Sequence, residues 1–175
     1  MTLNIELLEK VKARIMAEPL DFDIFASIEQ GCGTVACIAG HAVILHAGSE
    51  QKAWDLCEVE GEFNWGFVED TAMVALGLNS TEADKLFILH NWDEPYCSQY
   101  ARRRGTVDEL IHRYYNPDST VSEVQSFVVK QAIAGVNPQC RKPLDQDTID
   151  VIIKLKREMA EVVCKRINHF IATRK

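Results

Sequence analysis

The sequence predicts an all-α fold, in which a single compact domain of 175 residues holds roughly seven helices around a buried central helix over about residues 35–47. Three observations predict this class. Apolar residues recur at helical spacing in most segments, several of these segments begin with a helix-capping sequence, and no segment alternates polar and apolar residues convincingly over the length of a strand. The nearest to such an alternation, residues 125–129, lies inside a predicted helix.

The first predicted element is a helix over residues 3–17, where Leu8, Val11 and Ile15 recur at spacings of three and four. The pattern stops before a proline, which cannot continue a helix. A short helical segment is expected over residues 21–28.

The central helix is expected to begin at Thr34, which can cap it, and to run to about Ala47. Gly48 follows in the position where a left-handed residue commonly ends a helix. Apolar residues surround this helix on nearly all sides, so we expect other helices to enclose it.

A short helix is expected around Trp54, and the apolar stripe between residues 68 and 76 predicts another helix that ends at Gly77. Asn79 and Glu82 form a capping box, so a further helix should begin there. These two helices should form a tight corner, because only a short segment joins them.

Two more capping boxes begin at Thr106 and Thr120, and they predict helices that run to about residues 115 and 134.

A long amphipathic helix is predicted at the C-terminal end, over residues 148–173. At about 1.5 Å per residue it would span roughly 38 Å, which is longer than the body of a domain of this size requires. We therefore expect it to overhang the domain and to meet a partner protein or a second copy of the chain. Its apolar stripe consists of Ile152, Leu155, Met159, Val163, Ile167 and Phe170.

Charge is distributed unevenly along the chain. Residues 1–139 carry 10 Lys or Arg and 21 Asp or Glu, a net charge of −11, whereas residues 140–175 carry 9 and 5, a net charge of +4. An acidic body repels a phosphate backbone, so we expect no nucleic-acid partner. The basic C-terminal part is expected to pack back on the acidic body or to meet an acidic partner. The basic cluster at residues 102–104 is expected to form either a solvated corner or an ion-pairing face, and not a phosphate-binding patch.

The sequence has neither the composition of a signal peptide at its start nor a run of roughly 20 apolar residues that could cross a membrane. We therefore expect a cytoplasmic protein without a membrane partner, whose six cysteines are reduced thiols.

The most unusual motif is residues 31–41, Gly-Cys-Gly-Thr-Val-Ala-Cys-Ile-Ala-Gly-His. If Thr34 caps the helix, Cys37 lies in the first turn, where backbone N–H groups and the helix dipole favour a thiolate. His41 lies one turn further on the same face and could serve as its base. One hypothesis is therefore a thiol-dependent hydrolase or transferase that uses Cys37 with His41.

Two other interpretations fit the same residues. Cys32, Cys37 and His41 could hold a structural metal ion, although Cys-x4-Cys-x3-His is not a common zinc spacing. Alternatively, the glycines form a sharp turn, and the small residues of the helix let another helix approach closely. We favour this structural interpretation, because cysteine is among the most buried residue types and the chain is large enough to fold without a metal. No cofactor is expected.

We expect a non-catalytic helical binding protein. Its acidic, aromatic segment over residues 49–70 is one candidate surface for a protein partner, and the C-terminal helix is the other. Residues 90–97 combine polar, aromatic and acidic groups at a helix end, as a site for a small polar ligand would, but an irregular helix exit is the favoured interpretation. The candidate binding residues are Trp54, Phe63, Trp65, Phe67 and Trp92.

Two stretches of the chain form a recognisable pattern: Cys32–Gly40, preceded by Asp21-Phe22-Asp23, and Leu76-Gly77-Leu78, followed by Ala83, Leu86 and Phe87. On these residues the chain resembles a group of small uncharacterised bacterial and phage proteins that share a Cys-Gly-Thr-x-x-Cys-x-Ala-Gly helix start and a downstream Leu-Gly-Leu and Leu-Phe pair. The resemblance covers roughly residues 5–115, implies a bacterial protein and brings no assigned activity. That group tends to carry an aromatic residue, often Trp, after the Ala-Gly, so the resemblance implies that His41 is a packing position and not a catalytic partner.

Overall fold

The structure, a computed structural model, describes residues 2–24, 28–29, 35–59, 62–115, 126–136 and 140–174. Within these ranges it contains eight α-helices, two 3₁₀-helices and two antiparallel pairs of two-residue strands, so the predicted all-α class is confirmed. The α-helices are α1 (Ile5–Ala17), α2 (Ile38–Ala47), α3 (Glu50–Cys57), α4 (Trp65–Leu76), α5 (Ser80–Phe87), α6 (Tyr96–His112), α7 (Ser126–Ile133) and α8 (Gln146–Thr173). The 3₁₀-helices are η1 (Pro19–Asp21) and η2 (Leu89–Asn91), and the strand pairs are β1 (Ile28–Glu29) with β2 (Val35–Ala36) and β3 (Glu58–Val59) with β4 (Glu62–Phe63).

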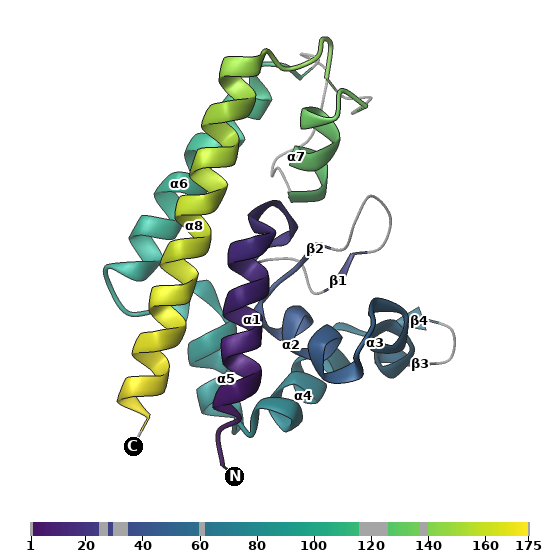
Figure 1. Cartoon of the computed structure of the whole chain (residues 1–175), viewed down its shortest axis with the longest axis vertical. Helices are drawn as coiled ribbons and strands as arrows, with labels where there is room; N and C mark the ends of the chain where they lie inside the picture. The colour runs from purple at the N-terminus through teal and green to yellow at the C-terminus, as the bar shows by residue number, and fades with distance from the viewer. Residues whose placement is uncertain are drawn as a thin grey trace.

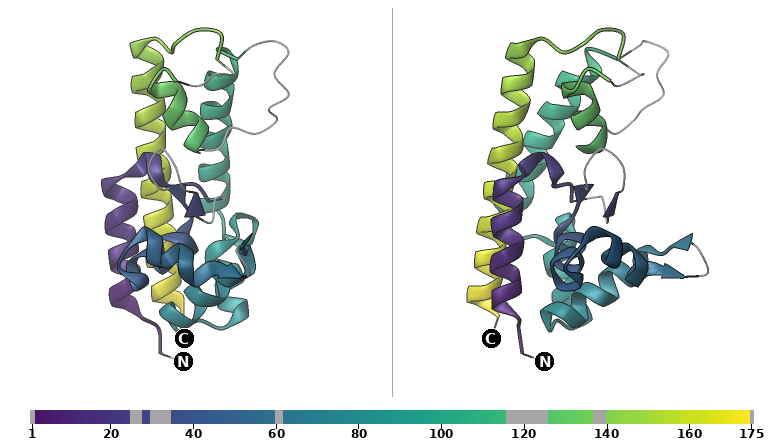
Figure 2. Two further views of the ribbon diagram at one scale, coloured as in Figure 1. Left: turned by 90° about the vertical axis from the view of Figure 1, so that its right-hand side faces the viewer. Right: turned by 45° about the vertical axis from the view of Figure 1, so that its right-hand side comes forward.

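Helix α8 runs along the long axis of the molecule, and α6 and α1 pack against it at different heights (Figure 1). Helix α6 lies beside its N-terminal half, and α1 lies beside its C-terminal half. On the other side of α1, α2 packs against α1, α3 and α4. Figure 2 shows that the two chain ends lie at the same end of the molecule.

The described core falls into two apolar clusters. The larger cluster contains residues of α1, α2, α4, α5 and the C-terminal part of α8, whereas the smaller one joins the end of α6, α7 and the first turns of α8. Every residue from Ile38 to Ile44 is buried, so α2 is the enclosed central helix that its composition predicts. None of the helices in the described ranges combines the length and the apolar character needed to cross a lipid bilayer.

The prediction that the C-terminal helix overhangs the domain is wrong. Buried residues follow one another along α8 from Ile152 to Phe170, because α6 covers one half of the helix and α1 covers the other. The prediction that the basic C-terminal part packs back on the acidic body is confirmed, since both Lys156 and Arg166 are buried within the fold.

Helix ends agree well with the sequence prediction. Gly48 and Gly77 end α2 and α4 with positive φ angles of 83° and 67°. The capping box of Asn79 and Glu82 begins α5, with hydrogen bonds in both directions.

Helix starts agree less well. Helix α2 begins at Ile38, and not at Thr34, because residues 35–36 are extended and pair with β1. Helix α6 begins at Tyr96, so Thr106 lies inside it and donates its hydroxyl hydrogen to the Arg102 carbonyl instead of capping. Of the described residues in the range 21–28, only Asp21 is helical, as the last residue of η1. Thr120 lies outside the described residues.

The corner between α4 and α5 binds the N-terminal segment of the chain. The Asn4 backbone N–H donates to the Leu76 carbonyl at 2.9 Å, and the Asn4 side-chain amide donates to the Ala75 carbonyl at 3.1 Å. The approach is so close that a Cβ atom on Gly77 would lie 2.1 Å from the Thr2 carbonyl oxygen. Only glycine fits here, both for its φ angle and for the space.

The same corner binds the C-terminal end of α8. The Arg174 guanidinium pairs with Glu82, with 2.6 Å from Nε to Oε1, and Nη2 donates to the Gly77 carbonyl at 2.9 Å. Glu82 therefore caps α5 and binds Arg174 at once, and its hydrogen bonds with the Asn79 backbone and with Arg174 lower its carboxyl pKa in spite of partial burial.

Replacement of Gly77 by alanine should destabilise the protein more than the same replacement at Gly48. Both residues have positive φ, which costs alanine about 1 kcal/mol, but only Gly77 has a neighbouring atom in the way. We expect a loss of about 1 kcal/mol for Gly48→Ala and about 3 kcal/mol for Gly77→Ala in urea unfolding. If both variants lose the same unfolding free energy, the N-terminal segment moves away from residue 77 without a measurable cost.

Charged side chains meet where the two apolar clusters join. Asp23 is buried after η1 and accepts a hydrogen bond from Arg104 of α6, 2.8 Å from Nη1 to Oδ1. Lys156 of α8 is also buried, and its ammonium group donates to the Phe22 carbonyl at 2.6 Å. Because burial disfavours its charged form, the pKa of Lys156 is lowered to about 8, although the carboxylate of Asp23 opposes this shift.

Loss of the Asp23 charge should destabilise the fold strongly. Asp23→Asn keeps the shape of the side chain but leaves the buried Lys156 and the half-buried Arg104 without this counter-charge, so we expect a loss of about 3 kcal/mol in unfolding free energy. Asp55→Asn, on the exposed side of α3, is the matched control and should change stability by less than about 0.5 kcal/mol. A loss as small as that of the control would show that the buried charges are dispensable.

Candidate functional site

Cys37 of the Gly-Cys-Gly motif precedes α2 and does not lie within its first turn. It is the N-cap residue, and its Sγ accepts a hydrogen bond from the Gly40 N–H at 3.5 Å. The predicted position inside the first turn is therefore wrong, because the strand pairing of Ala36 delays the start of the helix. Cys32 and Thr34 lie outside the described residues.

The surroundings of Cys37 and His41 keep both groups neutral at pH 7. Burial raises the pKa of the Cys37 thiol to about 11, and this effect outweighs the hydrogen bond from the Gly40 N–H. His41 has no exposed surface, and its ring stacks on Phe22 with centroids 6.2 Å apart. Burial, together with the nearby charge of Arg14, lowers the pKa of His41 to about 4. An activated thiolate with a general base needs the opposite shift at the cysteine and a base pKa near 7.

The described residues hold no group of three or more His, Cys, Asp or Glu side chains that could bind a metal ion. The metal hypothesis also requires Cys32, of whose position nothing is described, so Cys32 with Cys37 and His41 stays a prediction.

Cys37 should react slowly with iodoacetamide in the folded protein. With a pKa of about 11, only about one thousandth of the thiol is ionised at pH 8, so we expect labelling about 100-fold slower than in urea-unfolded protein. The rate for each cysteine can be followed across pH by peptide mass spectrometry. Labelling of Cys37 below pH 8 as fast as in the unfolded chain would restore the thiol-enzyme hypothesis.

The predicted aromatic binding residues are dispersed by the fold. Trp54 is partly buried against the larger cluster, and Phe67 is 43% exposed on α4. Trp92 is only 4% exposed; its indole N–H donates to the Leu86 carbonyl at 3.0 Å, and its ring packs edge-on against Tyr100. Trp92 thus fixes the chain where it leaves α5. This agrees with the interpretation of residues 90–97 as an irregular helix exit. The side chains of Phe63 and Trp65 are outside the description.

Phe67 belongs to a larger surface on α4 and α5. Val74, two helical turns further on the same face of α4, is 72% exposed. Beside them a groove of about 170 Å³ runs between α4 and α5. We call this surface the α4 face, and it consists of Phe67 and Val74 with the groove residues Glu69, Asp70, Met73 and Asp84.

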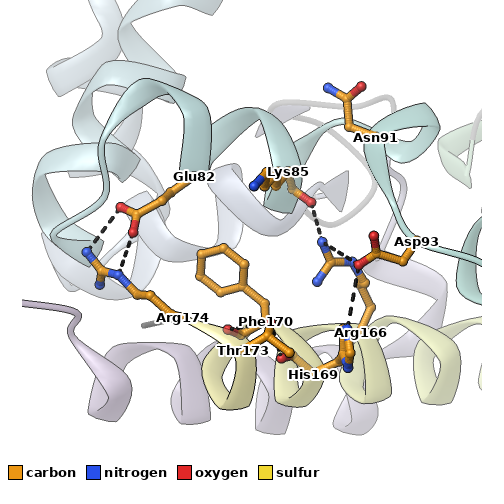
Figure 3. A pocket seen from close by; sticks show the side chains of 9 residues that line it. All are labelled: Glu82, Lys85, Asn91, Asp93, Arg166, His169, Phe170, Thr173 and Arg174. Carbon is orange, nitrogen blue, oxygen red and sulfur yellow. Dashed lines mark hydrogen bonds and ion pairs between the residues drawn. The ribbon is translucent and has the colours of Figure 1, made fainter.

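A cavity of about 470 Å³ lies between α5, η2 and the C-terminal part of α8 (Figure 3). Asn91 and Asp93 line it, and both belong to the segment that the sequence marks as polar and acidic. Arg166 of α8 and Arg174, which follows α8, complete it, and nothing in the sequence connects them with that segment. The only sequence signal for them is the basic character of the C-terminal part.

Comparisons with protein families, with curated proteins and with solved structures found no match to this chain. The resemblance to the bacterial and phage group stays a prediction.

Proposed function

We propose that this is a non-catalytic binding protein of the bacterial cytoplasm, and that its α4 face binds a basic amphipathic helix of a partner protein. The observation that carries the proposal is the position of two exposed apolar side chains, Phe67 and Val74, on one face of α4 beside a groove with three carboxylates. An amphipathic helix recognised in a groove offers apolar anchors at this spacing, and basic flanks would complement the acids.

The charge balance of the fold supports a basic partner. Lys156 and Arg166 of α8 are buried, and Arg174 is paired with Glu82, so three of the nine Lys and Arg residues in the range 140–175 are used inside the molecule. The carboxylates of Glu69, Asp70 and Asp84 line the groove without a lysine or arginine among its lining residues. Such a surface attracts positive partners and raises their association rate.

We propose a protein without catalytic activity because Cys37 and His41 are both in their neutral forms, so Cys37 is not an activated thiolate. The five described cysteines are free thiols, which supports a reducing compartment. Against a nucleic-acid partner stand the net charge of −7 and the ion pairs of Arg103 with Glu158 and of Arg104 with Asp23. Self-association through α8 has little support, because its apolar stripe is covered.

The proposal is tested with a model amphipathic helix of leucine and lysine, labelled with a fluorophore and titrated with the protein. Val74→Lys places a like charge in the α4 face, and we expect it to raise the dissociation constant by about tenfold. Val151→Lys, at the distant N-terminal end of α8, makes the same change in net charge at another exposed valine and should raise it by less than about twofold. Equal effects of the two variants would show that the peptide responds only to the net charge of the protein and not to the α4 face. If the peptide does not bind at all, the proposal is wrong.

A further inference from the structure

The cavity between α5, η2 and α8 contains a buried cation that is only partly satisfied. Arg166 is 2% exposed, and its Nη2 donates to the Lys85 carbonyl at 2.8 Å. The guanidinium Nε is buried and has no hydrogen-bond partner within the described part of the chain. A buried donor without an acceptor is costly, so this group is prepared for a ligand that brings an acceptor.

Asp93 supplies a negative charge at the same cavity. Its Oδ2 lies 3.8 Å from Arg166 Nη2 and 3.6 Å from His169 Nε2, both beyond ordinary hydrogen-bond distance. The side chain of Asp93 is 63% exposed, and Figure 3 shows it beside the Arg166 guanidinium at one end of the cavity. The cation and the carboxylate therefore face the same space without a hydrogen bond between them.

The opposite end of the cavity is closed by a complete ion pair. Arg174 binds Glu82 through Nε at 2.6 Å and through Nη2 at 3.1 Å. This two-bond pair satisfies the Glu82 carboxylate, which also caps α5. The side chain of Lys85, which is exposed on α5, also lines the cavity. The opposite charges that lie next to each other there are those of Arg166 and Asp93.

These two opposite charges favour a ligand that carries both signs. A simple anion bound at Arg166 would bring its charge close to Asp93, and a simple cation bound at Asp93 would lie close to Arg166. A zwitterion places a carboxylate at the guanidinium and an ammonium group at the carboxylate, so each charge meets its opposite. In a free α-amino acid these two groups sit on one carbon, which suits charges only 3.8 Å apart.

The rest of the cavity has room for a side chain. Its volume of about 470 Å³ exceeds what an amino-acid head group needs, and the ring of Phe170 forms part of the wall, with Arg166 Cζ 5.9 Å above its centroid. We propose that this cavity binds a free α-amino acid, with its carboxylate on Arg166 and its ammonium group on Asp93. This site is separate from the α4 face and does not depend on it.

The test uses three probes that share the 3-methylbutyl group, in isothermal titration calorimetry with the full chain. L-Leucine carries both charges, 4-methylpentanoate carries only the carboxylate, and 3-methylbutylamine carries only the ammonium group. We expect L-leucine to bind at least about tenfold more tightly than either of the others. Equal binding of 4-methylpentanoate, or no binding of L-leucine up to about 20 mM, would overturn the proposal.

Variants then locate the binding. Arg166→Gln should weaken L-leucine binding by at least about tenfold, whereas Arg157→Gln, on the exposed side of α8, should leave it unchanged. Asp93→Asn changes a mostly exposed side chain, so this variant should fold. It therefore tests the site even if Arg166→Gln does not fold. It should weaken L-leucine to the level of 4-methylpentanoate without weakening 4-methylpentanoate itself. If Asp93→Asn binds L-leucine as tightly as the unchanged protein, the ammonium group is not recognised there and the proposal is wrong.

Discussion

The interior charges of Asp23 and Lys156, together with the half-buried Arg104, fix how α8 sits in the molecule. Each lies on a different part of the chain, and they meet where the two apolar clusters join. Apolar contacts alone tolerate a helix that slides or rotates, but a buried ammonium group must reach its acceptor. Rotation of α8 by one residue would turn Lys156 by about 100° away from the Phe22 carbonyl. The same register directs the later arginines of α8 toward α5, so the interior charges also determine the shape of the cavity at the far end.

The features that sequence reasoning predicted correctly depend on a few neighbouring residues. The glycines that end α2 and α4, and the capping box of α5, act through hydrogen bonds and φ angles within one turn. The incorrect predictions depend on partners far along the chain. Pairing with β1 keeps residues 35–36 extended and delays α2, and α6 continues through Thr106 from an earlier start. The length of α8 suggested an overhang, since the sequence does not reveal that α6 and α1 cover it end to end.

In the candidate sites, too, local features could be predicted from the sequence and features that depend on distant segments could not. The spacing of Cys37 and His41 places them near each other, but their chemistry is set by burial, which depends on the packing of other helices. Among the aromatic residues, composition could not separate Trp92, which holds the helix exit, from Phe67, which faces solvent. Only one side of the cavity could be predicted from the sequence. The polar helix exit that lines it can be recognised within one segment, whereas Arg166, which completes it, belongs to another helix.

The α4–α5 corner has a consequence for how the protein is made. Asn4 binds it from one end of the chain and Arg174 from the other. During translation the corner can recruit the N-terminal segment early, but its contacts with Arg174 form only when residue 174 has left the ribosome. Contacts between segments so distant in sequence form slowly, because a long loop must close first. The nascent chain therefore exposes the apolar surfaces of α1 and α6 that α8 later covers, and exposed apolar surface of this kind favours aggregation until α8 is in place.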